Sequence, residues 1–93
     1  LLIQENADPD VQVDLNEFFK RLVPNSNDPS MRWVSHVMEG PDDMPAHIKA
    51  SMMPVSLSIP ISDGRLVLGT WQGIYLFEHR THAHRRQVMH ISG

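Results

Sequence analysis

The sequence predicts an α+β domain, because two helical patterns are followed by residues that alternate as strands do. Apolar residues recur at helical spacing over residues 9–22, and a second, shorter helix is expected over residues 45–53. From residue 55, apolar and polar residues alternate up to Asp63-Gly64, a typical hairpin turn. Helices and antiparallel strands are therefore expected in separate parts of the chain.

The chain has 93 residues, which corresponds to one small domain covering residues 1–93. At 41% hydrophobic and 20% charged it has the composition of an ordinary globular protein, and no apolar run reaches the roughly 20 residues of a membrane helix. It contains no cysteine, so a metal ion would have to be bound by His, Asp and Glu. The opening residues lack the basic region of a signal peptide, and a cytoplasmic protein is expected.

The first helix is predicted to begin at Asp8-Pro9, an N-cap followed by a proline at the first helical position. It ends before Pro24. Its apolar stripe is formed by Val11, Leu15, Phe18 and Leu22. The helix is therefore expected to be amphipathic and to pack on the rest of the domain through this stripe.

Residues 24–43 show no sustained period and are rich in Pro, Asn, Ser and Asp, so they are predicted to form a long loop. Loops of this length in a compact domain often have a function. Beyond the second helix, strands are predicted on both sides of the Asp63-Gly64 turn. Strands are also predicted over residues 71–80 and over residues 86–92.

The net charge of −3 is distributed unevenly. Five acids precede the first base, Lys20, whereas no acid follows Glu78. The C-terminal end is basic instead and carries Arg80, His82, His84, Arg85, Arg86 and His90. This end could meet an anion or remain a solvated basic edge. Nucleic acid is not expected as a partner, because no basic stripe with interleaved aromatic residues is present.

The strongest chemical pattern is "HVMEGPDDMPAH", which places His36, Glu39, Asp42, Asp43 and His47 within twelve residues. Imidazole and carboxylate groups together suit zinc or a similar divalent ion, although the spacing matches no known zinc-protease motif. His36 and His47 are the predicted metal ligands. In the alternative interpretation Asp42 and Asp43 only cap the second helix.

Several other polar residues leave a structural and a functional role open. Glu78 falls on the same strand face as apolar neighbours, so it either pairs with a structural arginine or acts as a general acid, a general base or a metal ligand. Arg85 and Arg86 suit a phosphate group. Asn6 and Asp8 could stabilise turns or bind substrate.

Four segments together resemble the YjbQ family, often described as the secondary thiamine-phosphate synthase family: "NADPDV", "EGPDDMPAHIKASM", "DGRLVLGTWQGIYLFEHR" and "RRQV". The resemblance runs from Gln4 to the C-terminus. Family members carry additional N-terminal strands with a His-Thr-Ser-Ala motif, which this sequence lacks, and usually have "NEN" where "QEN" occurs here. The chain is therefore expected to lack one histidine of the family's presumed site.

The resemblance implies a strongly curved mixed sheet and a homotrimer with pockets near the subunit boundaries. The family's polar positions correspond to Asn6, Asp8, His36, Glu39, His47, Ser51, Thr70, Gln72 and Glu78. These residues are expected to line a shared pocket. The associated activity, regarded as secondary, joins a pyrimidine diphosphate to a thiazole phosphate with loss of pyrophosphate.

Two functions follow from these observations. In the first, the protein is a thiamine-phosphate synthase-like transferase that uses zinc or magnesium, with Glu78 or His36 transferring protons and Arg85 or Arg86 binding the anion. In the second, it is a non-catalytic trimer that binds a metal ion or a small ligand. Under either function His36 and His47 should converge, and Glu78 should serve the ligand rather than a structural arginine.

Overall fold

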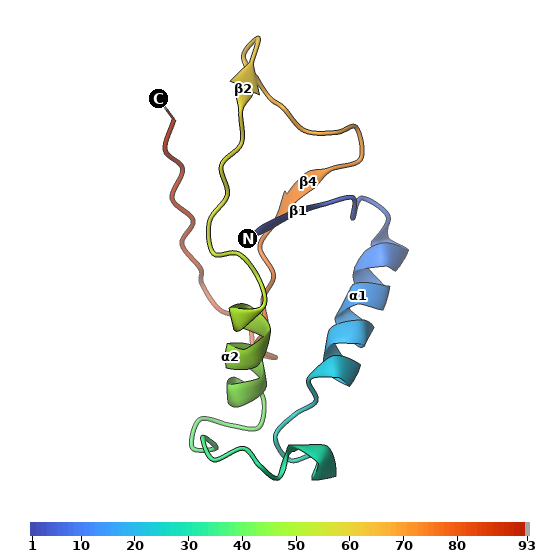
Figure 1. Cartoon of the computed structure of the whole chain (residues 1–93), viewed down its shortest axis with the longest axis vertical. Coiled ribbons are helices and arrows are strands. Elements are labelled where there is room, and N and C mark those ends of the chain that lie inside the picture. The colour runs from blue at the N-terminus through green and yellow to red at the C-terminus, as the bar shows by residue number, and fades with distance from the viewer. Residues whose placement is uncertain (93) are drawn as a thin grey trace.

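The computed structural model describes residues 1–92 and shows two helices, one short 3-10 helix and four short strands (Figure 1). In chain order the elements are β1 (Leu2–Gln4), α1 (Pro9–Leu22), η1 (Pro29–Met31), α2 (Asp43–Ser51), β2 (Ile61–Ser62), β3 (Arg65–Leu66) and β4 (Gly73–Tyr75). The predicted α+β class is confirmed. None of the helices within these residues has the length and apolar character needed to cross a membrane.

Helix α1 has the predicted bounds because its start is determined by local chemistry. The side chain of Asp8 accepts a hydrogen bond of 2.9 Å from the backbone N–H of Asp10, and Pro9 occupies the first turn. The buried stripe differs from the predicted one, since Phe18 and Leu22 are exposed. Residues four apart face the protein instead: Val11, Leu15, Phe19 and Val23.

Helix α2 begins two residues earlier than predicted, at Asp43. Pro45 lies in its first turn, where backbone N–H groups have no partner within the helix, so the proline removes no helical hydrogen bond. Before α2, Ser26 closes the long loop at its base. Its backbone N–H and hydroxyl both donate to the carbonyl oxygen of Pro41, at 2.8 and 3.2 Å.

The strands form two separate antiparallel pairs. Strand β1 pairs with β4, with Ile3 opposite Ile74, and β2 pairs with β3 across the predicted hairpin. Asp63 and Gly64 have φ angles of 52° and 72°, as a two-residue turn with two left-handed positions requires. The hairpin prediction is confirmed.

The predicted strand lengths are wrong for the residues that the structure describes. Regular pairing is limited to β4 within residues 71–80, and residues 86–92 form no strand. The reason is the lack of a partner, because a strand needs a hydrogen-bonded neighbour and these segments have none along most of their length. Figure 1 shows residues 86–92 as an extended terminal segment.

The apolar core of the described residues is small. Among large apolar residues only Val23 and Met31 are buried, at 7% and 5% exposure, together with the fully buried Pro45. The molecule measures 52 × 28 × 21 Å, which is elongated for its size. Many apolar side chains along the hairpin and the C-terminal segment are exposed, among them Val55, Ile61, Leu66, Val67, Val88, Met89 and Ile91.

Candidate functional site

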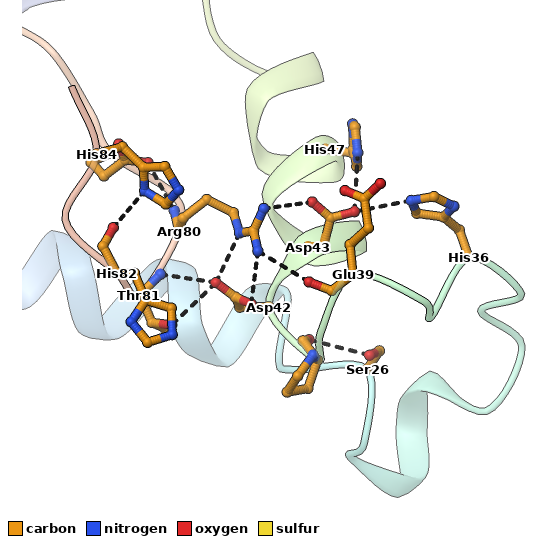
Figure 2. A network of polar contacts seen from close by, with 12 residues as sticks. Ser26, His36, Glu39, Asp42, Asp43, His47, Arg80, Thr81, His82 and His84 are labelled. Carbon is orange, nitrogen blue, oxygen red and sulfur yellow. Dashed lines mark hydrogen bonds and ion pairs between the residues drawn. The ribbon is translucent and has the colours of Figure 1, made fainter. Parts of the chain in front are cut away.

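Arg80 connects the C-terminal half of the chain to the start of α2 (Figure 2). Its Nε donates to Oδ2 of Asp42 at 3.0 Å, and its Nη1 donates to Oδ1 of Asp43 at 2.8 Å. Its Nη2 donates to the backbone carbonyl of Glu39 at 3.1 Å. All three guanidinium nitrogens are therefore used to hold the segment that precedes and opens α2.

Asp42 is the buried centre of this contact. Its Oδ2 also accepts hydrogen bonds from the backbone N–H and the hydroxyl of Thr81, at 3.0 and 3.1 Å. The Arg80 guanidinium, followed by the Thr81 N–H, holds the pKa of the Asp42 carboxyl well below its usual range. The side chain of Asp42 makes no capping bond to α2, so the interpretation of this residue as a side-chain helix cap is wrong.

Asp43 brings together the two predicted metal ligands. Its carboxylate Oδ2 lies 3.0 Å from Nε2 of His36 and 3.4 Å from Nε2 of His47. The two ring nitrogens and the carboxylate oxygen all lie within 4.8 Å of one another. Asp43 and His47 are four residues apart on α2 and therefore share one face, whereas His36 comes from the preceding loop.

The cluster is buried on one side and open on the other. The side chain of Asp43 is only 6% exposed, while those of His36 and His47 are 49% and 61% exposed. Because Arg80 occupies Oδ1, the carboxylate presents a single oxygen to the histidines (Figure 2). Two imidazoles and one carboxylate oxygen form a donor set that fits a divalent transition metal with open positions toward solvent.

A cavity of about 340 Å³ adjoins this cluster and is lined by Asp43, His47, Glu78, Arg80 and Arg86, among others. Within it, Arg86 Nε and Nη2 donate to Oε1 and Oε2 of Glu78 at 2.7 and 2.8 Å. This two-bond contact with Arg86 lowers the pKa of Glu78 to about 2. The expectation that no arginine holds the Glu78 carboxylate is therefore wrong, although the side chain does face the same cavity as His47.

The remaining predicted site residues have local partners or lie at the surface. Asn6 is buried, lines a cavity with Glu78, and accepts a hydrogen bond from Gln12 through its backbone carbonyl. Asp8 caps α1. Ser51 donates to the carbonyl of Ile48 at 2.6 Å. The side chains of Glu39 and Arg85 are exposed.

Thr70 and Gln72 do not join the histidine cluster. Both are exposed, and the side-chain oxygen of Gln72 accepts a hydrogen bond of 2.6 Å from the backbone N–H of Gly69. In Figure 1 the segment just before β4 lies in the upper half of the view, whereas the start of α2, which carries Asp43 and His47, lies in the lower half. The expectation of one pocket shared by all predicted residues is thus wrong within this chain.

The sequence placed Asp43 in the histidine and carboxylate pattern, but only His36 and His47 were predicted as ligands, and the supporting roles of Arg80 and Thr81 were not predicted. The four-residue spacing of Asp43 and His47 was the available signal for Asp43 as a third possible ligand. No local signal points to Arg80, because it follows Asp43 by 37 positions.

The fold and the cluster define a small α+β protein with a candidate metal-binding site at the start of its second helix. The chain belongs to the UPF0047 protein YjbQ-like family, whose family model matches residues 1–93. The predicted family resemblance is confirmed.

Curated relatives carry the same family name. The chain is 54% identical to a UPF0047 protein of Synechocystis sp. over 100% of its length and 61% of the relative's. It is 46% identical to UPF0047 protein YjbQ of Escherichia coli O157:H7 over 96% of its length and 61% of the relative's. The chain thus spans about three fifths of these relatives. No solved structure matches it at a significant level.

Proposed function

We propose that the protein is a metal-dependent enzyme that binds a small phosphorylated substrate beside the His36, Asp43 and His47 cluster. One observation carries the proposal: a buried carboxylate has one oxygen fixed by Arg80 and turns the other toward two half-exposed imidazoles. A ligand whose second oxygen is hydrogen-bonded in this way is typical of metal sites, where such partners orient the metal-binding atoms.

The donor set favours zinc over magnesium. Magnesium prefers oxygen ligands in octahedral geometry, whereas imidazole nitrogen suits zinc and iron. Bound there, the metal ion would supply Lewis-acid stabilisation of negative charge on a phosphate oxygen. His36, Asp43 and His47 would hold it, and the remaining coordination positions would face solvent.

The adjoining cavity supports a phosphorylated substrate. Arg86 uses Nε and Nη2 on Glu78, which leaves Nη1 as a donor for an anion, and the neighbouring Arg85 is exposed. Glu78 lines the same cavity as His47, and a phosphate that drew Arg86 onto itself would free the Glu78 carboxylate for proton transfer. The specific reaction that we propose is of the thiamine-phosphate synthase type, in which a pyrimidine diphosphate is joined to a thiazole phosphate.

The test has two arms. Zinc binding is measured by calorimetry for the natural protein and for the variants His36→Ala and His47→Ala, with His90→Ala as a matched control because His90 is exposed and outside the cluster. Thiamine-phosphate formation is then measured with zinc and with magnesium. Zinc binding that survives both cluster variants would refute the metal site, and zinc binding without turnover would refute the enzyme.

A second candidate function is a non-catalytic homotrimer that binds a metal ion or small ligand. The small apolar core and the exposed apolar residues of the hairpin and C-terminal segment favour self-association, because contact with other copies would bury these side chains. The non-catalytic homotrimer would bind the metal ion at the same site as the enzyme but would show no turnover.

A further inference from the structure

A groove of about 610 Å³ lies between the two helices, separate from the histidine cluster. Helix α1 contributes Phe19 and Lys20 to its lining, helix α2 contributes Lys49, and the segment after β4 contributes Phe77 and His79. Figure 1 shows the two helices as neighbouring columns below the β1–β4 pair. The volume falls in the range of pockets that bind small organic molecules.

The only two lysines of the chain, Lys20 and Lys49, both line this groove. Neither forms an ion pair with any residue from 1 to 92. Burial lowers the pKa of Lys49, the negative charge of Asp42 opposes this, and the positive charge of Lys20 adds a smaller lowering. Two like charges thus line one groove, with Asp42 acting on Lys49 but outside ion-pair distance among the described residues.

The acids at the groove do not compensate for the lysines. The charged and titratable groups that line it are Lys20, Lys49, Asp42, Glu78, His79 and Arg80. Asp42 is bound by Arg80, which also binds Asp43, and Glu78 is bound by Arg86. Among the lining residues, three cations (Lys20, Lys49 and Arg80) face two acids (Asp42 and Glu78). The groove therefore retains an excess of positive charge.

Aromatic and apolar side chains form the rest of its wall. Phe19 and Phe77 pack edge to face with ring centroids 5.3 Å apart, and His79 stacks on Phe77 at 4.8 Å. Nδ1 of His79 is buried and has no hydrogen-bond partner among the described residues. Burial, followed by the charge of Lys49, lowers the pKa of His79, which favours the neutral ring with one nitrogen donor and one acceptor.

We propose that this groove is a second ligand site, which binds a small organic anion with its carboxylate or phosphate between Lys20 and Lys49 and its apolar ring against Phe19 and Phe77. The combination of two positive groups at one end and apolar walls at the other is typical of pockets that orient such molecules. The site shares residues of the segment 77–80 with the cavity beside the histidine cluster, but it requires no metal ion.

The probes are benzoate, phenyl phosphate, inorganic phosphate and benzyl alcohol. Reductive ¹³C-methylation labels both lysines and keeps their charge, so each methyl signal reports on the groove in NMR titrations. Saturable shifts of both lysine signals with benzoate or phenyl phosphate are expected, and the tighter of the two identifies the anionic group. Equal binding of benzyl alcohol would refute the role of charge, and equal binding of inorganic phosphate would refute the role of the apolar walls.

Variants separate a specific contact from general electrostatics. Lys20→Gln is expected to weaken binding about tenfold, as loss of a charged hydrogen-bond donor does. Arg21→Gln is the matched control, since it removes the same charge from the next residue of α1 but does not line the groove. If Arg21→Gln weakens binding as much as Lys20→Gln, the proposal is wrong. His36→Ala is expected to leave benzoate binding intact while reducing zinc binding. The proposed metal site and the proposed anion site are therefore tested separately, and one can be refuted without the other.

Discussion

Arg80 donates a hydrogen bond of 2.8 Å to Oδ1 of Asp43, so that only Oδ2 of this buried carboxylate faces His36 and His47. The same guanidinium group binds Asp42 through Nε. One side chain from the C-terminal half of the chain thereby determines the orientation of a carboxylate at the start of α2. The histidine cluster depends on a residue that does not belong to it.

Replacing Arg80 by Gln is expected to lower zinc affinity about 10–100-fold, the usual loss when a supporting partner of a ligand is removed. The variant leaves both histidines and Asp43 in place but removes all of the support that Arg80 gives, including its bonds to Asp42 and to the carbonyl of Glu39. Calorimetry with zinc measures the effect, and Arg65→Gln, in the exposed strand β3, is the control. Unchanged affinity in the Arg80 variant would show that Asp43 needs no support to bind the metal.

Replacing Asp43 by Asn retains the size of the side chain but removes its charge. We expect zinc affinity to fall at least about tenfold, because a carboxylate ligand is lost between two imidazoles. Circular dichroism checks that α2 persists. Zinc affinity equal to that of the natural protein would mean that the two histidines bind without Asp43.

The stability of the protein should fall in acid through Glu78. Its folded-state pKa, about 2, lies below the ordinary value of 4.5 because of the bonds from Arg86, so its stabilising contribution is present above about pH 4.5 and is lost as the pH falls toward 2. The glutamine variant Glu78→Gln lacks this contribution at every pH. Its melting temperature should therefore be lower than that of the natural protein at neutral pH and should decline less between about pH 5 and about pH 2.

Asp14→Asn provides the comparison for this pH series, since Asp14 is exposed and its side chain makes no hydrogen bond with the described residues. It should show the same acid decline as the natural protein. A Glu78→Gln curve parallel to that of the natural protein would mean that the Arg86 contact does not stabilise the fold. Turnover retained by Glu78→Gln would assign this carboxylate a structural role only.

Self-association should depend on the exposed apolar residues of the hairpin. We expect light scattering at micromolar concentration to give the mass of a trimer, and Ile61→Ser with Leu66→Ser to shift it toward the monomer, because both side chains lose apolar area that an interface would bury. Ser62→Ala, on the same hairpin, is the control. A stable folded monomer of the natural protein would overturn the trimer.

Local signals in the sequence were sufficient for α1, α2 and the hairpin. The cap at Asp8 and the turn at Asp63-Gly64 each involve only a few neighbouring residues, so their conformation does not depend on distant parts of the chain. The apolar stripe of α1 was only half correct, because Phe19, rather than Phe18, contacts Phe77. Which of the two phenylalanines faces the protein is therefore determined by Phe77, a residue far along the sequence.

The strands and the site depended on partners far along the sequence. Residues 86–92 alternate as a strand does but have no neighbour to pair with in the described chain. The convergence of His36 with His47 followed from their common segment. An arginine partner for Glu78 was one interpretation of the sequence, but the sequence did not identify it as Arg86. Thr70 and Gln72 were assigned through family resemblance alone, and neither lines the cavity beside the histidines.

The contact between Ser26 and Pro41 has a consequence for how the site can change during evolution. It joins the two ends of the long loop, so that residues between them can be inserted or deleted while the helices on either side keep their positions. Of the three candidate ligands only His36 lies inside this closed loop. Selection could therefore alter how firmly the protein retains its metal by changing the length of one loop, with the helical part of the site inherited unchanged.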